Sequence, residues 1–99
     1  MILQTFIKQP AEVKDYDVDF APWLTPIGDT IDDVTATIEC LTDPTDTSLK
    51  CDLIWYTETY CKFWVSGGTA DKRYKLTALT STVEGRIDES ELIFVVRDY

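Results

Sequence analysis

The stretch that most constrains the fold is a pair of alternating segments joined by Gly67-Gly68. Residues 60–66 before the glycines and residues 72–82 after them alternate β-branched or aromatic side chains with polar ones, which is typical of β-strands. Adjacent glycines readily adopt the positive φ angles of tight hairpin turns. We therefore expect a β-hairpin at the centre of a sheet. The residues of its first strand expected to face inward are Cys61, Phe63 and Val65.

Further segments of the chain show the same alternation. In residues 15–20 three aspartates alternate with apolar residues, which predicts a half-buried strand with a charged outer face. Strands are also expected over residues 31–41, 49–56 and 87–97. No segment shows a sustained helical period. The pattern predicts an all-β fold, an antiparallel β-sandwich of immunoglobulin or fibronectin type with about six or seven strands.

Two prolines interrupt the pattern after residue 20, and a third separates the first residues from the rest. Residues 21–26 contain Pro22 and Pro26 and are expected to form a turn that places Trp23 and Leu24 into one end of the core. Pro10 lies near the middle of a mixed segment, residues 1–14. We expect these residues to form an N-terminal arm and residues 15–99 to form a single β-sandwich domain.

The charge balance narrows the possible partners. The chain has 18 acidic and 9 basic residues, a formal net charge of −9. Binding a phosphate backbone needs lysines and arginines that displace counterions, and anionic membranes repel an acidic surface. We therefore expect neither nucleic acid nor a membrane as a partner. The first residues lack the basic and long apolar regions of a signal peptide, which predicts synthesis in a cytoplasm.

Chemistry-bearing residues are sparse. The chain has no histidine, and its three cysteines lack the close spacing of metal sites. The aspartates at 15, 17 and 19 have calcium-loop spacing, but Phe20 and Pro26 stand where an EF-hand needs glycine and glutamate. A weak cation site among the acidic loop residues stays open as an alternative. We predict no catalytic residues, no metal and no cofactor. The acidic loop residues are Asp29, Asp32, Asp33, Asp43 and Asp46.

Two sets of residues are candidates for contacts with other proteins. If its neighbours on the strand face inward, Trp64 faces outward, and an exposed tryptophan on a rigid strand suits a protein–protein contact. The arm is apolar at four positions, and it could either dock on a neighbouring subunit or form an extra edge strand of its own domain. A second hypothesis is a carbohydrate- or surface-binding module that uses Trp55, Tyr56 and Trp64. The apolar arm residues are Ile2, Leu3, Phe6 and Ile7.

Several motifs together resemble a known family. They are the segment from Asp15 to Phe20, Trp23-Leu24, Gly28-Asp29-Thr30-Ile31, and a second block that begins with Trp64-Val65-Ser66-Gly67-Gly68-Thr69 and continues through Tyr74-Lys75-Leu76-Thr77 to Gly85-Arg86 and Glu89. In order and spacing the sequence is similar to small bacteriophage structural proteins described as fiber-tail adaptors or neck-region proteins. The resemblance runs from about Lys8 to the C-terminus and departs from the family pattern over residues 42–59.

The resemblance implies a function that composition does not. It implies a non-enzymatic virion structural protein with a β-sandwich fold, an adaptor at the head–tail or tail–fiber junction that acts through protein–protein contacts. The implied partners are other phage structural proteins, such as portal, adaptor, tail or fiber proteins, and copies of the chain itself in a homo-oligomer. The implied location is the virion, after synthesis in the cytoplasm of a bacterial host. The resemblance supplies no ligand and no active site.

Overall fold

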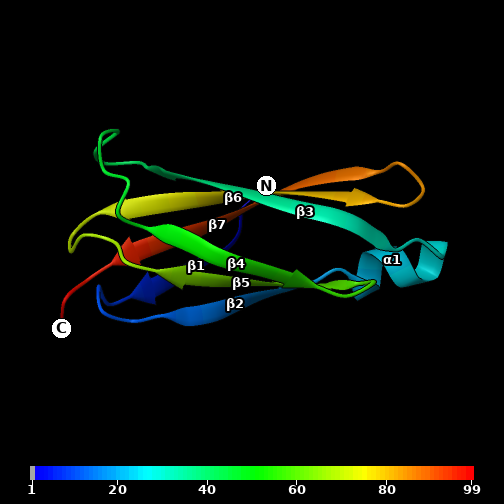
Figure 1. Cartoon of the computed structure of the whole chain (residues 1–99), viewed down its shortest axis with the longest axis horizontal. Helices are drawn as coiled ribbons and strands as arrows, with labels where there is room; N and C mark the ends of the chain where they lie inside the picture. Colours follow the sequence, from blue (N-terminus) through cyan, green and yellow to red (C-terminus); the bar gives the residue numbers. More distant parts are fainter. Residues whose placement is uncertain (1) are drawn as a thin grey trace.

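The computed structural model describes residues 2–99 as two β-sheets packed face to face, with one short helix at one end (Figure 1). The strand order is β1-β7-β6-β3 in one sheet and β2-β5-β4 in the other. No helix among residues 2–99 is long and apolar enough to cross a membrane. The elements are β1 (Ile2–Lys8), β2 (Lys14–Asp19), α1 (Ala21–Ile27), β3 (Ile31–Cys40), β4 (Lys50–Tyr56), β5 (Tyr60–Ser66), β6 (Arg73–Thr82) and β7 (Ile87–Val96).

This architecture confirms the predicted all-β sandwich. An immunoglobulin domain, with strands lettered A to G in chain order, has C, F and G in one sheet and B, E and D in the other. Here β3, β6 and β7 take the places of C, F and G, while β2, β5 and β4 take those of B, E and D. β1, the counterpart of strand A, lies beside β7 (the counterpart of G) and not beside β2 (the counterpart of B). Its pairing with β7 is parallel, whereas the prediction had all strands antiparallel.

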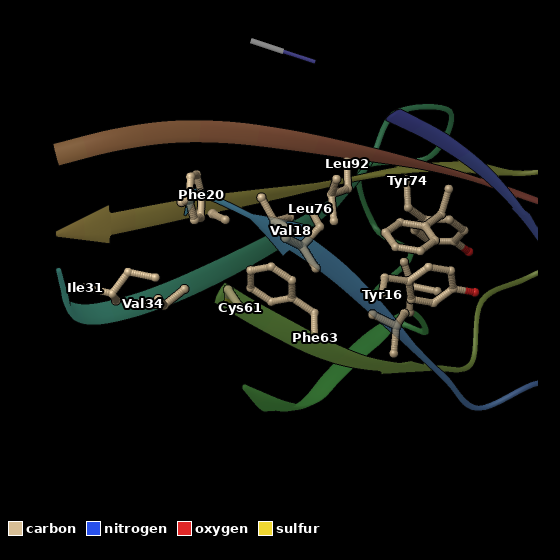
Figure 2. Packing of buried hydrophobic residues seen from close by; sticks show 14 of the residues in the cluster. Tyr16, Val18, Phe20, Ile31, Val34, Cys61, Phe63, Tyr74, Leu76 and Leu92 are labelled. Atoms are coloured by element: carbon tan, nitrogen blue, oxygen red, sulfur yellow. The ribbon is translucent and has the colours of Figure 1, made fainter. Parts of the chain in front are cut away.

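The core lies between the sheets and is built from the inward side of each alternating strand (Figure 2). Cys61, Phe63 and Val65 of β5 are fully buried, as the alternation predicts. Near β1 three aromatic rings from three strands meet: the ring centroids of Phe6 and Tyr16 are 4.6 Å apart, and those of Tyr16 and Phe94 are 4.8 Å apart. Such contacts add stability beyond the area they bury, which helps a domain of this size.

The predicted hairpin at Gly67-Gly68 is wrong. β5 is the middle strand of one sheet and β6 is an inner strand of the other, so the glycines lie in a connection that crosses between the sheets. Glycine is needed at both positions because the backbone here passes very close to Ser48 and Val96. A Cβ on Gly67 would lie 2.1 Å from the carbonyl oxygen of Ser48, and one on Gly68 would lie 2.8 Å from a methyl group of Val96. Both glycines have positive φ.

The predicted turn after residue 20 is a short helix. Pro22 lies in the first turn of α1, where its missing N–H costs nothing, and Gly28 ends the helix in the left-handed conformation. With seven residues, α1 is too short for its period to be recognised in the sequence. Its position is the expected one, because Leu24 is fully buried and Trp23 packs against the core at one end of the sandwich.

The first residues of the chain form an edge strand. β1 pairs with β7 from Ile2↔Glu91 to Lys8↔Val96, so residues 2–8 follow the second of the two alternatives left open for the arm. Lys8 anchors the end of the strand: its side chain is buried, and its Nζ donates to the carbonyl oxygens of Gly67 at 2.6 Å and of Gln9 at 2.9 Å. Burial lowers the pKa of the Lys8 ammonium, while Glu12 nearby partly offsets this. Met1 lies outside the described residues.

Candidate protein-binding surfaces

The motif residues Asp29 and Arg86 meet at the α1 end of the sandwich. Asp29 is buried and accepts hydrogen bonds from the amides of Thr30 at 2.9 Å and Glu84 at 3.1 Å, and from Arg86 Nη1 at 2.8 Å. Burial would raise the pKa of this carboxyl, but the hydrogen bonds from Thr82, Arg86 and the two amides outweigh it and lower the pKa to about 2. The cluster holds the β6–β7 turn against the start of β3.

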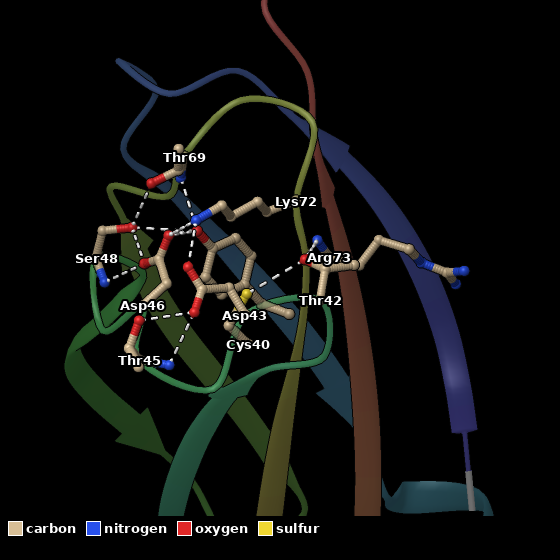
Figure 3. Close-up of polar contacts among 10 residues, drawn as sticks. Cys40, Thr42, Asp43, Thr45, Asp46, Ser48, Thr69, Lys72 and Arg73 are labelled. Atoms are coloured by element: carbon tan, nitrogen blue, oxygen red, sulfur yellow. Dashed lines mark hydrogen bonds and ion pairs between the residues drawn. The ribbon is translucent and has the colours of Figure 1, made fainter.

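The motif tyrosine, Tyr74, organises the opposite end, where it bonds to Asp46 and Thr69 of the polar cluster shown in Figure 3. At the start of β6 its hydroxyl accepts a hydrogen bond from the amide of Thr69 at 2.8 Å and donates one to Asp46 at 2.9 Å. A tyrosine whose hydroxyl bonds to the backbone just before strand F is the tyrosine corner of immunoglobulin-like domains. Ser48 also contacts Tyr74 Oη, at 3.1 Å. The motif therefore fixes the crossover loop between the sheets.

Lys72 lies between Asp43 and Asp46, two of the acidic loop residues considered above for a weak cation site. Its Nζ lies 2.8 Å from Asp43 and 3.2 Å from Asp46. Bonds from Lys72 and then Thr45 lower the pKa of Asp43 to about 2, and bonds from Ser48 lower the pKa of Asp46. Hydrogen bonds to the same two carboxylates raise the pKa of Lys72. Among residues 2–99 no three cysteine, aspartate or glutamate side chains are grouped to hold a metal ion.

Asp29, Arg86 and Tyr74 of the motifs bond within the fold, whereas several exposed apolar residues, including the motif residue Trp64, gather on two surfaces. We call the first the aromatic face: Leu53, Trp55, Tyr60 and Trp64 on the outer side of the sheet β2-β5-β4. Leu53 lies opposite Trp64 and Trp55 opposite Lys62 in the β4–β5 register. The exposed fractions are 56% for Leu53, 51% for Trp55 and 36% for Trp64. The alternation of β5 predicted that Trp64 faces outward, as it does, but Leu53 was not predicted to face outward, because a bulge between Cys51 and Leu53 interrupts the alternation of β4.

The second surface, which we call the apolar edge, consists of Ile2, Leu3 and Ile7 on β1. All three are exposed, and Ile7 lies beside Val95 of β7. The fourth apolar residue of the predicted arm, Phe6, does not belong to this surface. It faces the interior and contacts Phe94, with ring centroids 5.5 Å apart. The two surfaces belong to different sheets.

The geometry gives little support to a flat sugar-binding platform. The rings of Trp55 and Tyr60 stand at 75° to each other. The hydroxyl of Tyr56 donates a hydrogen bond to the carbonyl oxygen of Asp32 at 2.9 Å, so this side chain reaches across to the start of β3. A sugar-binding platform would present coplanar aromatic rings. The rings of Trp55 and Tyr60 are not coplanar, and the ring of Tyr56 is bonded toward β3.

Comparison with known proteins agrees with the motifs. A search of curated proteins finds no match. A family model described as podophage GP4 fiber-tail adaptor protein gp77 matches residues 8–95, which is most of the chain and includes both motif clusters. The chain therefore belongs to the podophage GP4 fiber-tail adaptor protein gp77 family.

Proposed function

We propose that this chain is a non-enzymatic virion protein that joins other phage structural proteins at the tail–fiber or head–tail junction. The observation that carries the proposal is the presence of two separate exposed apolar surfaces, the aromatic face and the apolar edge, on different sheets. An adaptor has to contact two neighbours at once, and large exposed apolar residues on rigid strands are suited to such contacts.

Polar residues at the two ends of the sandwich support a mechanical role. The motif residues Asp29 and Arg86 close one end, and the motif residue Tyr74 closes the other together with Lys72. These polar groups bond to one another and to backbone amides. They stiffen the loops, so the sandwich can hold its neighbours at a fixed distance and orientation. We expect several copies in a symmetric assembly, made in the host cytoplasm and kept apart before assembly by the net charge of −9.

Removing the protein from a phage tests this function. Particles made by a phage that lacks this chain should show filled heads without fibers or without tails in electron micrographs, and supplying the chain from a plasmid should restore them. The structure missing from the particles identifies the junction. Complete, infectious particles without this chain would overturn the proposal.

The apolar edge can be tested separately. Deleting residues 1–14 would remove β1 and uncover β7, so assembly defects would not report on docking. The double variant Leu3→Thr/Ile7→Thr keeps a strand-forming residue at each position and should lower the number of copies per particle. The control Val83→Thr/Ile87→Thr changes two exposed apolar residues elsewhere and should not. If both double variants are incorporated equally, the apolar edge does not contribute to docking.

A further inference from the structure

The aromatic face is bordered along its whole length by acidic side chains. In the β2–β5 register, Asp15 lies opposite Trp64, Asp17 opposite Lys62 and Asp19 opposite Tyr60. All three aspartates are exposed on β2, the edge strand of this sheet. The outer side of the sheet therefore carries two parallel strips, an apolar one over β4 and β5 and an acidic one over β2. We call the second strip the acidic row.

The acidic row keeps an excess of negative charge. Among residues 2–99, the cation that pairs with the acidic row is Lys62, with Nζ 2.6 Å from Asp15 and 3.5 Å from Asp17. This ammonium group contacts two of the three carboxylates of the row. Asp19 accepts a hydrogen bond from the amide of Ala21 at 2.9 Å, which leaves its charge in place. A partner that covered this face without cations of its own would have to desolvate uncompensated carboxylates, at a considerable cost.

From this arrangement, and resting on the proposed adaptor function, we propose that the aromatic face binds a basic segment of another virion protein. Apolar side chains of that segment pack on Leu53, Trp55 and Trp64, while lysines or arginines pair with the acidic row. Alternate residues of a strand are about 7 Å apart, so the basic groups of the partner follow a similar spacing. A second copy of this chain is disfavoured as the occupant, because its net charge is also −9.

Two variants test the two strips independently. Asp15→Asn/Asp17→Asn/Asp19→Asn removes the acidic row, and Leu53→Asn breaks the apolar strip at its most exposed residue. The matched control Asp33→Asn/Glu58→Gln/Glu89→Gln removes the same charge at exposed positions on other parts of the chain. Thermal unfolding of each purified variant confirms that it is folded. The readout is the number of copies per particle, measured by mass spectrometry in the complemented deletion phage.

We expect both face variants to reduce incorporation at least about tenfold, since losing a central contact commonly weakens binding by that much or more. The control triple should incorporate like wild type. If the aspartate triple also incorporates like wild type, the partner is not basic and the proposal fails. If the wild-type chain itself is absent from particles, the adaptor function fails instead, so the two failures are distinguishable.

A zero-length carbodiimide cross-linker identifies the occupant directly, because it joins carboxylates to lysine amines that touch them. Applied to wild-type particles, it should link peptides that contain Asp15, Asp17 or Asp19 to a different virion protein. Links to a lysine of this chain other than Lys62 would overturn the proposal in favour of self-association, whereas a link to Lys62 is expected within one chain, where it already contacts Asp15. A partner that uses arginine gives no link, and the triple variant then decides.

Discussion

Gly67 is the position where one added methyl group should do most damage to the fold. Its backbone has φ +77°, and a Cβ there would lie 2.1 Å from the carbonyl oxygen of Ser48. That carbonyl cannot easily retreat, because it accepts a hydrogen bond from the amide of Gly68 at 3.2 Å and the next residue, Leu49, is buried. The carbonyl of Gly67 is held in turn by buried Lys8. Gly67→Ala therefore adds a steric clash to backbone strain.

The size of the effect can be divided between these two causes. A left-handed backbone costs a non-glycine residue about 1–2 kcal/mol. Overpacking in a crowded site adds about 1–3 kcal/mol. Gly85 separates them, because its φ is +90° and nothing lies within 4 Å of the position its Cβ would take. Gly85→Ala should show the strain alone, and Gly67→Ala should lose about 1–3 kcal/mol more.

Urea unfolding followed by tryptophan fluorescence measures this difference. For a slope of about 1–3 kcal/mol per molar urea, Gly67→Ala should unfold roughly 1 M earlier than Gly85→Ala. Equal midpoints for the two variants would show that the crossover loop moves freely away from Ser48. That result would refute the claim that close approach, rather than turn geometry, requires Gly67.

Three further predictions concern the polar clusters and the core. Asp29→Ala removes a buried carboxylate that accepts from the part-buried amides of Thr30 and Glu84, and should lower the free energy of unfolding by about 2–3 kcal/mol, whereas exposed Asp33→Ala should have little effect in the same melts. The pKa of Asp29 and of Asp43 is lowered from 3.8 to about 2, so the stability these carboxylates contribute should be complete above pH 4 and lost as the pH falls toward 2. An acid titration of wild type followed by circular dichroism should show this loss, and Asp29→Asn should flatten it; an unchanged curve for the variant would contradict the assignment. Burial raises the pKa of the Cys61 thiol to about 12, so a disulfide reagent at pH 8 should label it only after denaturation. Because Cys51 is only partly buried, labelling is located by peptide mass, and rapid labelling of Cys61 itself in native protein would contradict its burial.

The alternation of side chains predicted the strand faces because it depends only on local geometry. Cys61, Phe63 and Val65 had to share one side of a strand, and the structure places all three in the core. Pairing was harder to predict. Gly67-Gly68 has the composition of a hairpin turn, but the sequence does not say whether the next strand stays in the same sheet or crosses to the other. The deciding fact is the position of Ser48 and Val96, which are distant in sequence.

For the candidate surfaces too, local orientation could be predicted from the sequence and strand pairing could not. Trp64 could be placed outside from its neighbours on β5, whereas Leu53 could not, because the bulge in β4 shifts the pattern by one residue. The acidic row was recognised as a charged outer face of its strand. Its position beside the aromatic residues depends on the pairing of β2 with β5, which joins segments more than 40 residues apart. The partnership of Asp29 with Arg86 is likewise a result of topology, although both belong to the motifs that pointed to the family.

The parallel pairing of β1 with β7 also sets the order in which the molecule can be completed. Ile2 pairs with Glu91 and Lys8 with Val96, so each contact of this pair closes a loop of nearly ninety residues. On the ribosome β1 is made well before β7, and it must wait unpaired until almost all the rest of the sandwich has emerged. The strand that carries the apolar edge is thus the last to find its place, and a nascent chain presents no finished edge to a growing particle.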